Sequence, residues 1–342
     1  MRIRTASALA GIAVAALALT GCVQGETSTG EAPAPEGEQA ERTLTLDWAT
    51  YNPLSLVIRD QGWLEDELES EGVTVEWVQS AGSNKANEFL RSGAIDVGST
   101  AGSAALLARS NGSPIKTIGV YSQPEWAALV VPAGSDITSV ADLAGRNVAA
   151  TSGTDPYFFL TQALATEGLT VDDVTVQNLQ HADGWAALQS GAVDAWAGLD
   201  PIMGGAIEAG AQFLFRDVDF NSYGVLNATE AFLEEDPDLA QAVIDAYEHA
   251  RAWALENPDE TIAILAEAAG IDEAVATQVI EERSNLDVSG IPGDDQLSVF
   301  TTIAPILVEI DAVSEQSLVD TALEELLDPT YAEAADPARF DD

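Results

Sequence analysis

The chain contains an internal repeat, and this repeat limits the folds that it can adopt. Residues 90–96 read Leu-Arg-Ser-Gly-Ala-Ile-Asp, and residues 188–194 read Leu-Gln-Ser-Gly-Ala-Val-Asp. Upstream, residues 71–75 (Glu-Gly-Val-Thr-Val) recur as residues 167–171 (Glu-Gly-Leu-Thr-Val). The offsets between the copies are 98 and 96 residues, so the copies stay in register. Such a repeat predicts two lobes of the same construction.

Within each copy, short apolar runs alternate with segments of helical spacing. In the first copy we expect strands at residues 43–49, 73–78, 96–98 and 115–121, with helices between them. The second copy repeats this order from residue 147 to residue 218. Alternating strands and helices are typical of mainly parallel sheets with helices on both faces. The expected fold class is therefore α/β, with two lobes and a ligand cleft between them.

From about residue 229 the pattern becomes purely helical. Apolar residues between 239 and 253 share one helical face, which predicts a helix that packs on a core. We therefore divide the folded part into lobe 1 (residues 43–127), lobe 2 (128–221) and a third segment. That segment, residues 222–342, is expected to return to lobe 1 and to end in helices.

The first 22 residues are typical of an export signal. Two arginines precede an apolar run at residues 8–19, which is too short to span a bilayer comfortably. The run ends in Leu-Thr-Gly-Cys, which resembles a bacterial lipobox with Cys22 as the lipidated residue. The alternative is an ordinary signal peptide that contains a cysteine. Residues 23–42 are polar and rich in Gly, Pro and Glu, so we expect a disordered tether. The protein should then be extracytoplasmic and lipid-anchored to the cell membrane.

Composition excludes several kinds of protein. The chain has 57 acidic and 13 basic residues, so nucleic acid and anionic lipid surfaces are poor partners. Its single cysteine, Cys22, excludes an internal disulfide and a cysteine-ligated zinc site. We expect no metal and no cofactor. The acidity has two readings, an adaptation to salty or alkaline surroundings or simply a well-solvated surface.

Candidate ligand-binding residues lie where helices should begin, beyond the carboxyl ends of the strands. Helix N-termini offer free N–H groups and partial positive charge, which suit an anion. The alternative is that these residues only cap helices. The first copy contributes Asn52, Ser83, Asn84, Ser99 and Thr100, and the second contributes Ser152, Thr154, Asp155, Asp183 and Asp200. Near the same edges lie Tyr51, Glu125, Trp126 and Trp185, whose aromatic members could wall a small-molecule site.

In these residues the chain resembles the substrate-binding proteins of ABC importers for aliphatic sulfonates, with taurine, nitrate and thiamine-precursor binders as relatives. The resemblance covers roughly residues 44–287. It is carried by residues 82–85, 90–96, 99–102, 124–126, 140–145, 153–159 and 194–196. It implies a type II-like periplasmic-binding-protein fold that crosses between lobes twice, which we place near residues 127–131 and 220–225.

The resemblance also implies a function and its partners. We expect a monomer that captures a small organosulfur anion, an aliphatic sulfonate or taurine, and delivers it to an ABC permease and ATPase. Nitrate, a sulfate ester or a pyrimidine remains an alternative ligand, and a lipid-anchored sensor remains an alternative role. A hydrolase is disfavoured because the sequence has neither a Gly-x-Ser-x-Gly nor a His-Glu-x-x-His motif. We expect no catalytic residues.

The cap residues also suggest how a ligand would be oriented. Those of the first copy are neutral, whereas Asp155, Asp183 and Asp200 carry carboxylates and Glu125 adds a fourth near the first crossing. This contrast favours a sulfonate head on lobe 1 and a cationic tail facing lobe 2, as in taurine. The alternative is that all four carboxylates are merely caps or solvated.

Overall fold

The structure is a computed structural model that describes residues 42–341. The predicted signal peptide, the lipidation at Cys22 and nearly all of the predicted tether lie outside the described residues.

The first sheet has five strands in the order β2-β1-β3-β10-β4. β1 (Arg42–Trp48) lies between β2 (Val73–Gln79) and β3 (Val97–Ala101) and is parallel to both. β10 (Gly224–Thr229) runs antiparallel between β3 and β4 (Ile115–Ser122). A strand from a distant part of the sequence therefore completes the first lobe.

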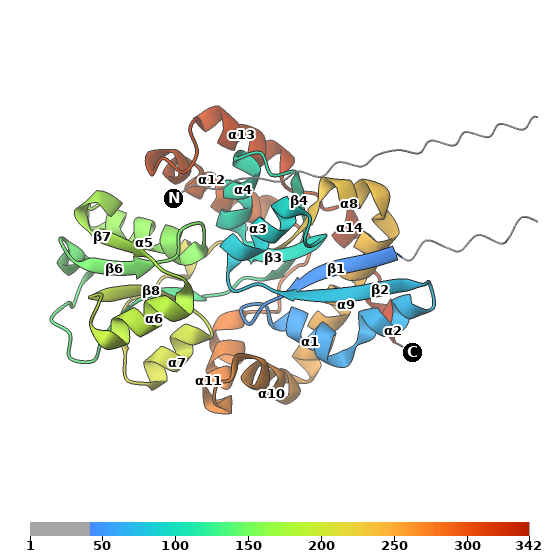
Figure 1. Ribbon diagram of the computed structural model, residues 1–342, viewed down its shortest axis with the longest axis horizontal. Helices are drawn as coiled ribbons and strands as arrows, with labels where there is room; N and C mark the ends of the chain where they lie inside the picture. The colour runs from blue at the N-terminus through green and yellow to red at the C-terminus, as the bar shows by residue number, and fades with distance from the viewer. Residues whose placement is uncertain (1–41, 342) are drawn as a thin grey trace, which may run out of the picture. The chain divides into compact units, whose positions relative to one another are not determined.

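The second sheet has the equivalent order, β7-β6-β8-β5-β9. β6 (Asn147–Ala150) is parallel to β7 (Thr175–Asn178) and β8 (Ala195–Leu199). β5 (Ala127–Val131) runs antiparallel between β8 and β9 (Gln212–Phe215). The two lobes thus have one topology, as the repeat predicts, and each sheet is mixed because one strand, β10 or β5, arrives from the other lobe. Figure 1 shows the lobe of β6 to β8 on the left and the lobe of β1 to β4 on the right.

Helices connect the strands within each lobe. α3 and α6 occupy equivalent positions in the repeat, and each ends at a glycine. Gly93 (φ 70°) and Gly191 (φ 73°) both adopt the left-handed conformation that favours glycine. The first lobe holds α1 (Pro53–Gln61), α2 (Trp63–Glu69), α3 (Ser83–Ser92) and α4 (Gly102–Ser110), and the second holds η1 (Val140–Leu143), α5 (Asp155–Thr166), η2 (Val171–Asp173), α6 (His181–Ser190), α7 (Ile202–Glu208) and η3 (Val218–Phe220).

The repeated aspartates, Asp96 just before β3 and Asp194 just before β8, form hydrogen bonds to the neighbouring parallel strands β1 and β6. In the first lobe the Thr45 N–H donates to Asp96 Oδ2 at 2.8 Å, and the Asp96 N–H donates to the Thr45 carbonyl at 2.8 Å. In the second lobe the Asn147 N–H donates to Asp194 Oδ2 at 2.8 Å, and the Asp194 N–H donates to the Asn147 carbonyl at 2.8 Å. The repeat therefore preserves a hydrogen-bonded pair that sets the register of adjacent parallel strands.

The C-terminal third is helical and packs mainly on the first lobe. α12 and α13 lie beside α4, and α10 lies beside α1 (Figure 1). Phe300 of α12 approaches α4 so closely that a Cβ at Gly102 would lie 2.2 Å from its ring, so only glycine fits there. The elements are α8 (Glu230–Glu235), α9 (Pro237–Glu256), α10 (Pro258–Ala269), α11 (Glu273–Gln278), the π-helical η4 (Val279–Ser284), α12 (Asp294–Glu309), α13 (Gln316–Glu325), α14 (Thr330–Glu333) and η5 (Pro337–Phe340).

The chain crosses between the sheets twice, in residues 123–126 after β4 and in residues 221–223 before β10. We expected the first crossing near residues 127–131, but these residues form β5, a fully buried strand of the second sheet. The apolar run forms a strand of the second sheet, so the four residues before it, Gln-Pro-Glu-Trp, make the crossing. The Gln123 N–H donates to the Asn285 carbonyl at 3.2 Å, and the Glu125 N–H to the Arg283 carbonyl at 2.8 Å. The first crossing is thereby tied to the end of η4.

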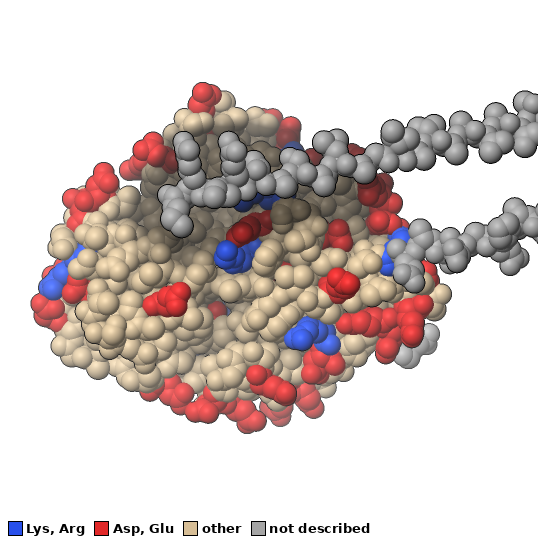
Figure 2. Space-filling view, viewed as in Figure 1, with Lys and Arg blue, Asp and Glu red and all other residues tan. Residues whose placement is uncertain are grey.

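The surface reflects the composition. On the face in view in Figure 2, acidic side chains clearly outnumber basic ones. Among residues 42–341, no helix combines the length and the apolar character needed to cross a membrane.

Candidate ligand-binding site

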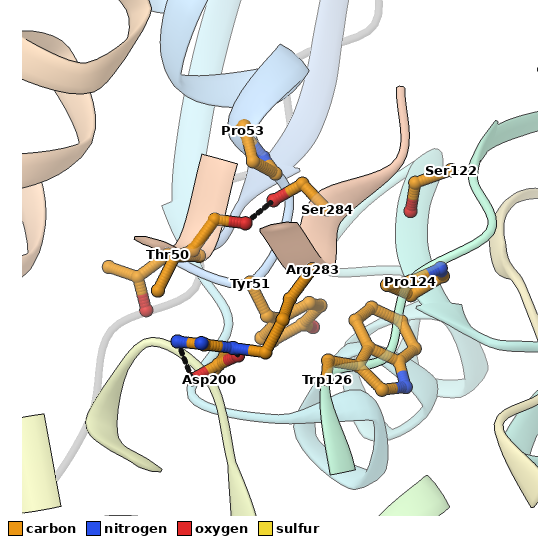
Figure 3. A pocket seen from close by; sticks show the side chains of 10 residues that line it. Thr50, Tyr51, Pro53, Ser122, Pro124, Trp126, Asp200, Arg283 and Ser284 are labelled. Atoms are coloured by element: carbon orange, nitrogen blue, oxygen red, sulfur yellow. Dashed lines mark hydrogen bonds and ion pairs between the residues drawn. The ribbon is translucent and has the colours of Figure 1, made fainter. Parts of the chain in front are cut away.

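A small cavity lies where four segments from both lobes meet, at the carboxyl ends of β1 and β8 (Figure 3). Its volume is about 10 Å³, roughly the space that one water molecule needs. A ligand can therefore enter only if the lobes or the lining side chains move apart. The lining residues are Thr50, Tyr51 and Pro53 after β1, Ser122, Pro124 and Trp126 at the first crossing, Asp200 after β8, and Val279, Arg283 and Ser284 of η4.

A buried ion pair forms one wall of the cavity. The Arg283 Nε–H donates to Asp200 Oδ2 at 2.5 Å, and the two side chains are 3% and 4% exposed. The Gly204 N–H also donates to Asp200 Oδ1, at 2.9 Å. Burial raises the pKa of Asp200, and the adjacent Arg283 opposes that shift. In Figure 3 the Arg283 side chain extends to the Asp200 carboxylate, and a dashed line joins the two.

Two aromatic rings form the apolar wall. The rings of Tyr51 and Trp126 pack edge to face with their centroids 5.9 Å apart, and both residues are buried. Their polar ends are occupied, since the Tyr51 hydroxyl donates to the Ser99 carbonyl at 3.0 Å and the Trp126 Nε1–H donates to Asp155 Oδ2 at 2.8 Å. The rings therefore offer the cavity their apolar faces and edges.

Asp155 does not face the cavity as a helix cap would. The N-cap of α5 is Thr154, and Asp155 is the first residue of the helix. Its buried carboxylate accepts hydrogen bonds from the Ser103 hydroxyl at 2.6 Å, from the Ser222 N–H at 2.9 Å and from the Ser222 hydroxyl, besides that of Trp126. Burial raises the pKa of Asp155, and the donors oppose the shift. This carboxylate links the second lobe to α4 of the first lobe and to both crossings.

The predicted cap Asn52 is the N-cap of α1, but its side chain is fully engaged. Its Oδ1 accepts the Ser55 N–H at 3.3 Å, and its Nδ2 donates to the Tyr247 hydroxyl of α9 at 3.1 Å. Asn52 therefore fixes α1 against α9, with both ends of its amide used inside the protein.

Ser99 and Thr100 do not begin a helix, in contrast to our expectation. Both lie inside β3, and the N-cap of α4 is Ala101. The Ser99 N–H and hydroxyl donate to Asp47 Oδ1 at 2.8 and 3.0 Å, and the Asn227 Nδ2 donates to the Thr100 hydroxyl at 2.8 Å. These buried partners hold the two residues in the sheet. Burial raises the pKa of Asp47 to about 7.

At the start of α3, the Ser83 hydroxyl has a hydrogen-bond partner, whereas Asn84 Oδ1 has none among the described residues. Gly82 is the N-cap, and the Ser83 hydroxyl accepts the Ala101 N–H at 2.9 Å. Asn84 Oδ1 is buried without a hydrogen-bond partner among the described residues. A Cβ on Gly82 would lie 2.9 Å from Asn84 Oδ1 and 2.9 Å from His181 Nε2. The starts of α3 and α6, which correspond in the repeat, therefore meet between the lobes.

His181 presents an acceptor to this contact. Its Nδ1 lies 3.2 Å from the Thr151 hydroxyl, whose own proton goes to the Leu179 carbonyl at 2.7 Å. The histidine Nδ1 must then carry the proton, which leaves Nε2 as an acceptor. Nε2 is buried and unpaired within residues 42–341. Burial lowers the pKa of His181 to about 4, so the ring is neutral at pH 7.

The remaining predicted residues lie outside the cavity. Ser152 and Asp183 are exposed. The ring of Trp185 packs against Trp196 of the second-lobe core, with the ring centroids 6.2 Å apart. Glu125 pairs with Arg216 at 2.6 Å. Of the four carboxylates that we expected near the ligand tail, Asp200 lines the cavity and pairs with Arg283, whereas Asp155, Asp183 and Glu125 do not line it.

The structure thus brings three of the predicted residues, Tyr51, Trp126 and Asp200, to one cavity. Arg283 was not predicted, because nothing in the local pattern connects it to Asp200, 83 residues earlier. One signal was available: the chain has only 13 basic residues, and Arg283 follows two glutamates in a strongly acidic segment. An isolated cation of that kind needs a carboxylate partner.

A wider groove of about 570 Å³ lies on the first lobe, between residues 109–114 and α13. Its Arg109 pairs with Glu230 and Glu325, both at 2.7 Å. The groove involves one lobe and its charged side chains pair with each other, so we take the cavity between the lobes as the candidate ligand site.

Known proteins resemble this chain over most of its length. A protein of Escherichia coli (strain K12) named "Putative aliphatic sulfonates-binding protein" is 30% identical over 246 residues, 71% of this chain and 72% of that protein. A protein of the same name from Bacillus subtilis (strain 168) is 27% identical over 242 residues, 70% of this chain and 73% of its own length.

Solved structures share the fold. The alkanesulfonate-binding protein SsuA from Xanthomonas axonopodis pv. citri, bound to MOPS, superposes with a TM-score of 0.75 at 24% identity, covering 82% of this chain and 97% of that one. The aliphatic sulphonate binding protein SsuA from Escherichia coli gives 0.72 at 25% identity, covering 84% and 93%. The desulfurization enzyme DSZB gives 0.63 at 18% identity, covering 86% and 98%, so the fold alone does not separate binding from catalysis.

The family model described as NMT1/THI5 like matches residues 55–261, more than half of the chain. This chain belongs to the NMT1/THI5-like family, as a solute-binding protein with the type II periplasmic-binding-protein fold.

Proposed function

We propose that this protein captures a small organosulfur anion, an aliphatic sulfonate or taurine, outside the cytoplasm and delivers it to an ABC permease and its ATPase. The observation that carries the proposal is the buried guanidinium of Arg283 in the wall of the interlobe cavity. A guanidinium presents several N–H donors in one plane and suits oxyanions such as a sulfonate. The names of the two sulfonate-binding relatives point to the same ligand class.

A thermal-shift panel on the purified protein tests the ligand class. The panel contains alkanesulfonates, taurine, a sulfate ester, nitrate and a pyrimidine. A ligand at one hundred times its dissociation constant stabilises the folded state by about 2.7 kcal/mol. We expect such a shift with sulfonates. A shift with nitrate or the pyrimidine alone would contradict the proposal.

The membrane attachment needs a separate test because residues 1–41 are not described. We propose that Cys22 carries the lipid, so Cys22→Ala should move the protein from the membrane pellet to the soluble fraction. The substitution should not change the melting temperature. A variant that stays in the pellet would contradict lipid anchoring.

A further inference from the structure

We infer that the second crossing is a strained hinge, in which closing the lobes forces Tyr223 into a left-handed backbone conformation and thereby favours the open protein. The inference goes beyond the proposed function, because it concerns how readily the lobes close and holds for any ligand. Tyr223 is not among the residues that line the cavity between the lobes. It acts on binding through the position of the lobes.

Left-handed residues other than glycine gather at the crossings. Within residues 42–341 there are three, Tyr223 (φ 59°), Asn285 (φ 43°) and Asp311 (φ 56°). Tyr223 belongs to the second crossing, and the Asn285 carbonyl accepts the Gln123 N–H of the first crossing at 3.2 Å. Asn and Asp tolerate this conformation, because their short polar side chains can bond to the local backbone. A tyrosine cannot, so Tyr223 is the most strained of the three.

The residue before Tyr223 is clamped between the lobes. From the second lobe, Asp155 of α5 accepts the Ser222 N–H at 2.9 Å and the Ser222 hydroxyl. From the first lobe, the Gly102 N–H donates to the Ser222 carbonyl at 3.0 Å, and the Ser103 N–H donates to the Ser222 hydroxyl at 2.8 Å. This arrangement exists only while the starts of α4 and α5 lie together, which is the closed position of the lobes.

The residue after Tyr223 is fixed in the first sheet. Gly224 begins β10 and pairs with Ala101 of β3 and Ser122 of β4. A Cβ on Gly224 would lie 2.4 Å from the Tyr121 ring, so the backbone there has no room to shift. Tyr223 thus joins one neighbour that moves with the lobes to one that stays in a sheet. Its dihedral angles must absorb the difference, as those of hinge residues do.

Two contributions oppose each other when the lobes close. The hydrogen bonds to the buried Asp155 carboxylate stabilise the closed position, and the left-handed conformation of Tyr223 destabilises it. When the lobes separate, Ser222 is released and Tyr223 can return to the extended region that an L-residue prefers. Removing the strain while keeping the bonds should therefore raise the closed population and the affinity for ligand.

The variants Tyr223→Gly and Tyr223→Ala isolate the strain, because both lack the tyrosine ring and they differ by one Cβ. Isothermal titration with propane-1-sulfonate compares their affinities. Glycine adopts the left-handed conformation without a steric clash, so we expect Tyr223→Gly to bind about fivefold more tightly than Tyr223→Ala. Equal affinities, or tighter binding by Tyr223→Ala, would overturn the inference.

A second pair of variants keeps a ring at this position, because Tyr223 is buried and its truncation could prevent folding. Histidine occurs in the left-handed region several times more often than most residues. At pH 8, where the introduced imidazole is neutral, Tyr223→His should bind the probe more tightly than Tyr223→Phe. The opposite order would count against the hinge.

A measurement without ligand separates this inference from the proposed function. Cys22 is the only cysteine, so a Cys22→Ala background accepts spin labels at two introduced cysteines. Ser92→Cys on α3 and Ser190→Cys on α6 place them at exposed, equivalent positions of the two lobes. The distance between the labels should be shorter in Tyr223→Gly than in Tyr223→Ala, even if no sulfonate binds. Identical distances would overturn the inference, even if a sulfonate does bind.

Asp311 provides the matched control, because it is left-handed and lies beyond the end of α12, away from both crossings. Asp311→Gly and Asp311→Ala should have the same affinity for propane-1-sulfonate and the same label distance. If this pair differed as much as the pair at Tyr223, relief of strain anywhere in the chain would produce the effect, and the assignment of a hinge to Tyr223 would fail.

Discussion

At the carboxyl end of its first strand, the first lobe buries Asp47, whereas the equivalent position of the second lobe is Ala149. The equivalence follows from Thr45 and Asn147, which make the same hydrogen bonds to the repeated aspartates. Conversely, the second lobe begins α6 with the buried His181, where the first lobe begins α3 with Ser83. The two copies make the same hydrogen bonds where neighbouring strands are aligned, and they carry different residues where the strands end. The repeat thus maintains the architecture, and the differences gather at the ligand cleft, where each lobe has its own polar groups.

The largest expected effect concerns the carboxylate that joins the lobes. Asp155→Ala leaves the donors of Ser103, Ser222 and Trp126 without their acceptor. At about 1–3 kcal/mol for each orphaned donor group, the free energy of unfolding should fall by about 5 kcal/mol. Urea unfolding measures it. Asp183→Ala is the control, since this exposed aspartate also lies in the first turn of a second-lobe helix, and its cost should stay below about 0.5 kcal/mol. Similar costs for both would mean that Asp155 does not link the lobes.

The buried acid of the first lobe should make stability fall as pH rises. Burial raises the pKa of Asp47 from 3.8 to about 7. Below pH 4 the group is protonated in both states, and between pH 4 and 7 it ionises in the unfolded chain first, which favours unfolding. The loss amounts to about 4 kcal/mol at most. Relative to Asp47→Asn, the wild-type protein should therefore lose stability over that range in denaturant titrations. A constant difference between the two proteins would contradict the burial of an acid there.

The buried base of the second lobe should respond in the opposite direction. Burial lowers the pKa of His181 from 6.5 to about 4. Its stabilising contribution is present above pH 6.5 and is lost as pH falls through 4, because the unfolded chain takes up the proton first. The change is about 3 kcal/mol. Relative to His181→Gln, the wild-type protein should lose stability on acidification, and His249→Gln controls for the loss of a histidine outside the cleft. If the stability difference between His181→Gln and the wild-type protein did not change with pH across this range, the ring would be hydrated.

Sequence periodicity predicted the lobes because strand and helix patterns are local and the repeat occurs twice. It could not predict that β5 and β10 run antiparallel, because each is placed by the return of the chain from the other lobe. The prediction that Asn52 caps a helix was correct, because its partner Ser55 is only three residues away. It failed for Ser99, because the buried Asp47, 52 residues earlier, takes its donors. Contacts of that span leave no local pattern, and the pair of Asp200 and Arg283 is of the same kind.

The smallest expected effect tests what the lobes share. Asp96→Ala and Asp194→Ala each remove the carboxylate that accepts a strand N–H at 2.8 Å. A hydrogen bond to a charged acceptor contributes about 1.5–3 kcal/mol, so each variant should lose about 2 kcal/mol in urea unfolding. Asp194 should lose slightly less, because its side chain is 35% exposed and water can replace part of the interaction. The two sites lie in different lobes without shared partners, so the double variant should show the sum within about 0.5 kcal/mol. If one substitution proved neutral while the other cost its full amount, the repeated aspartates would not perform the same task, and the architecture of one lobe would have to rest on its other contacts.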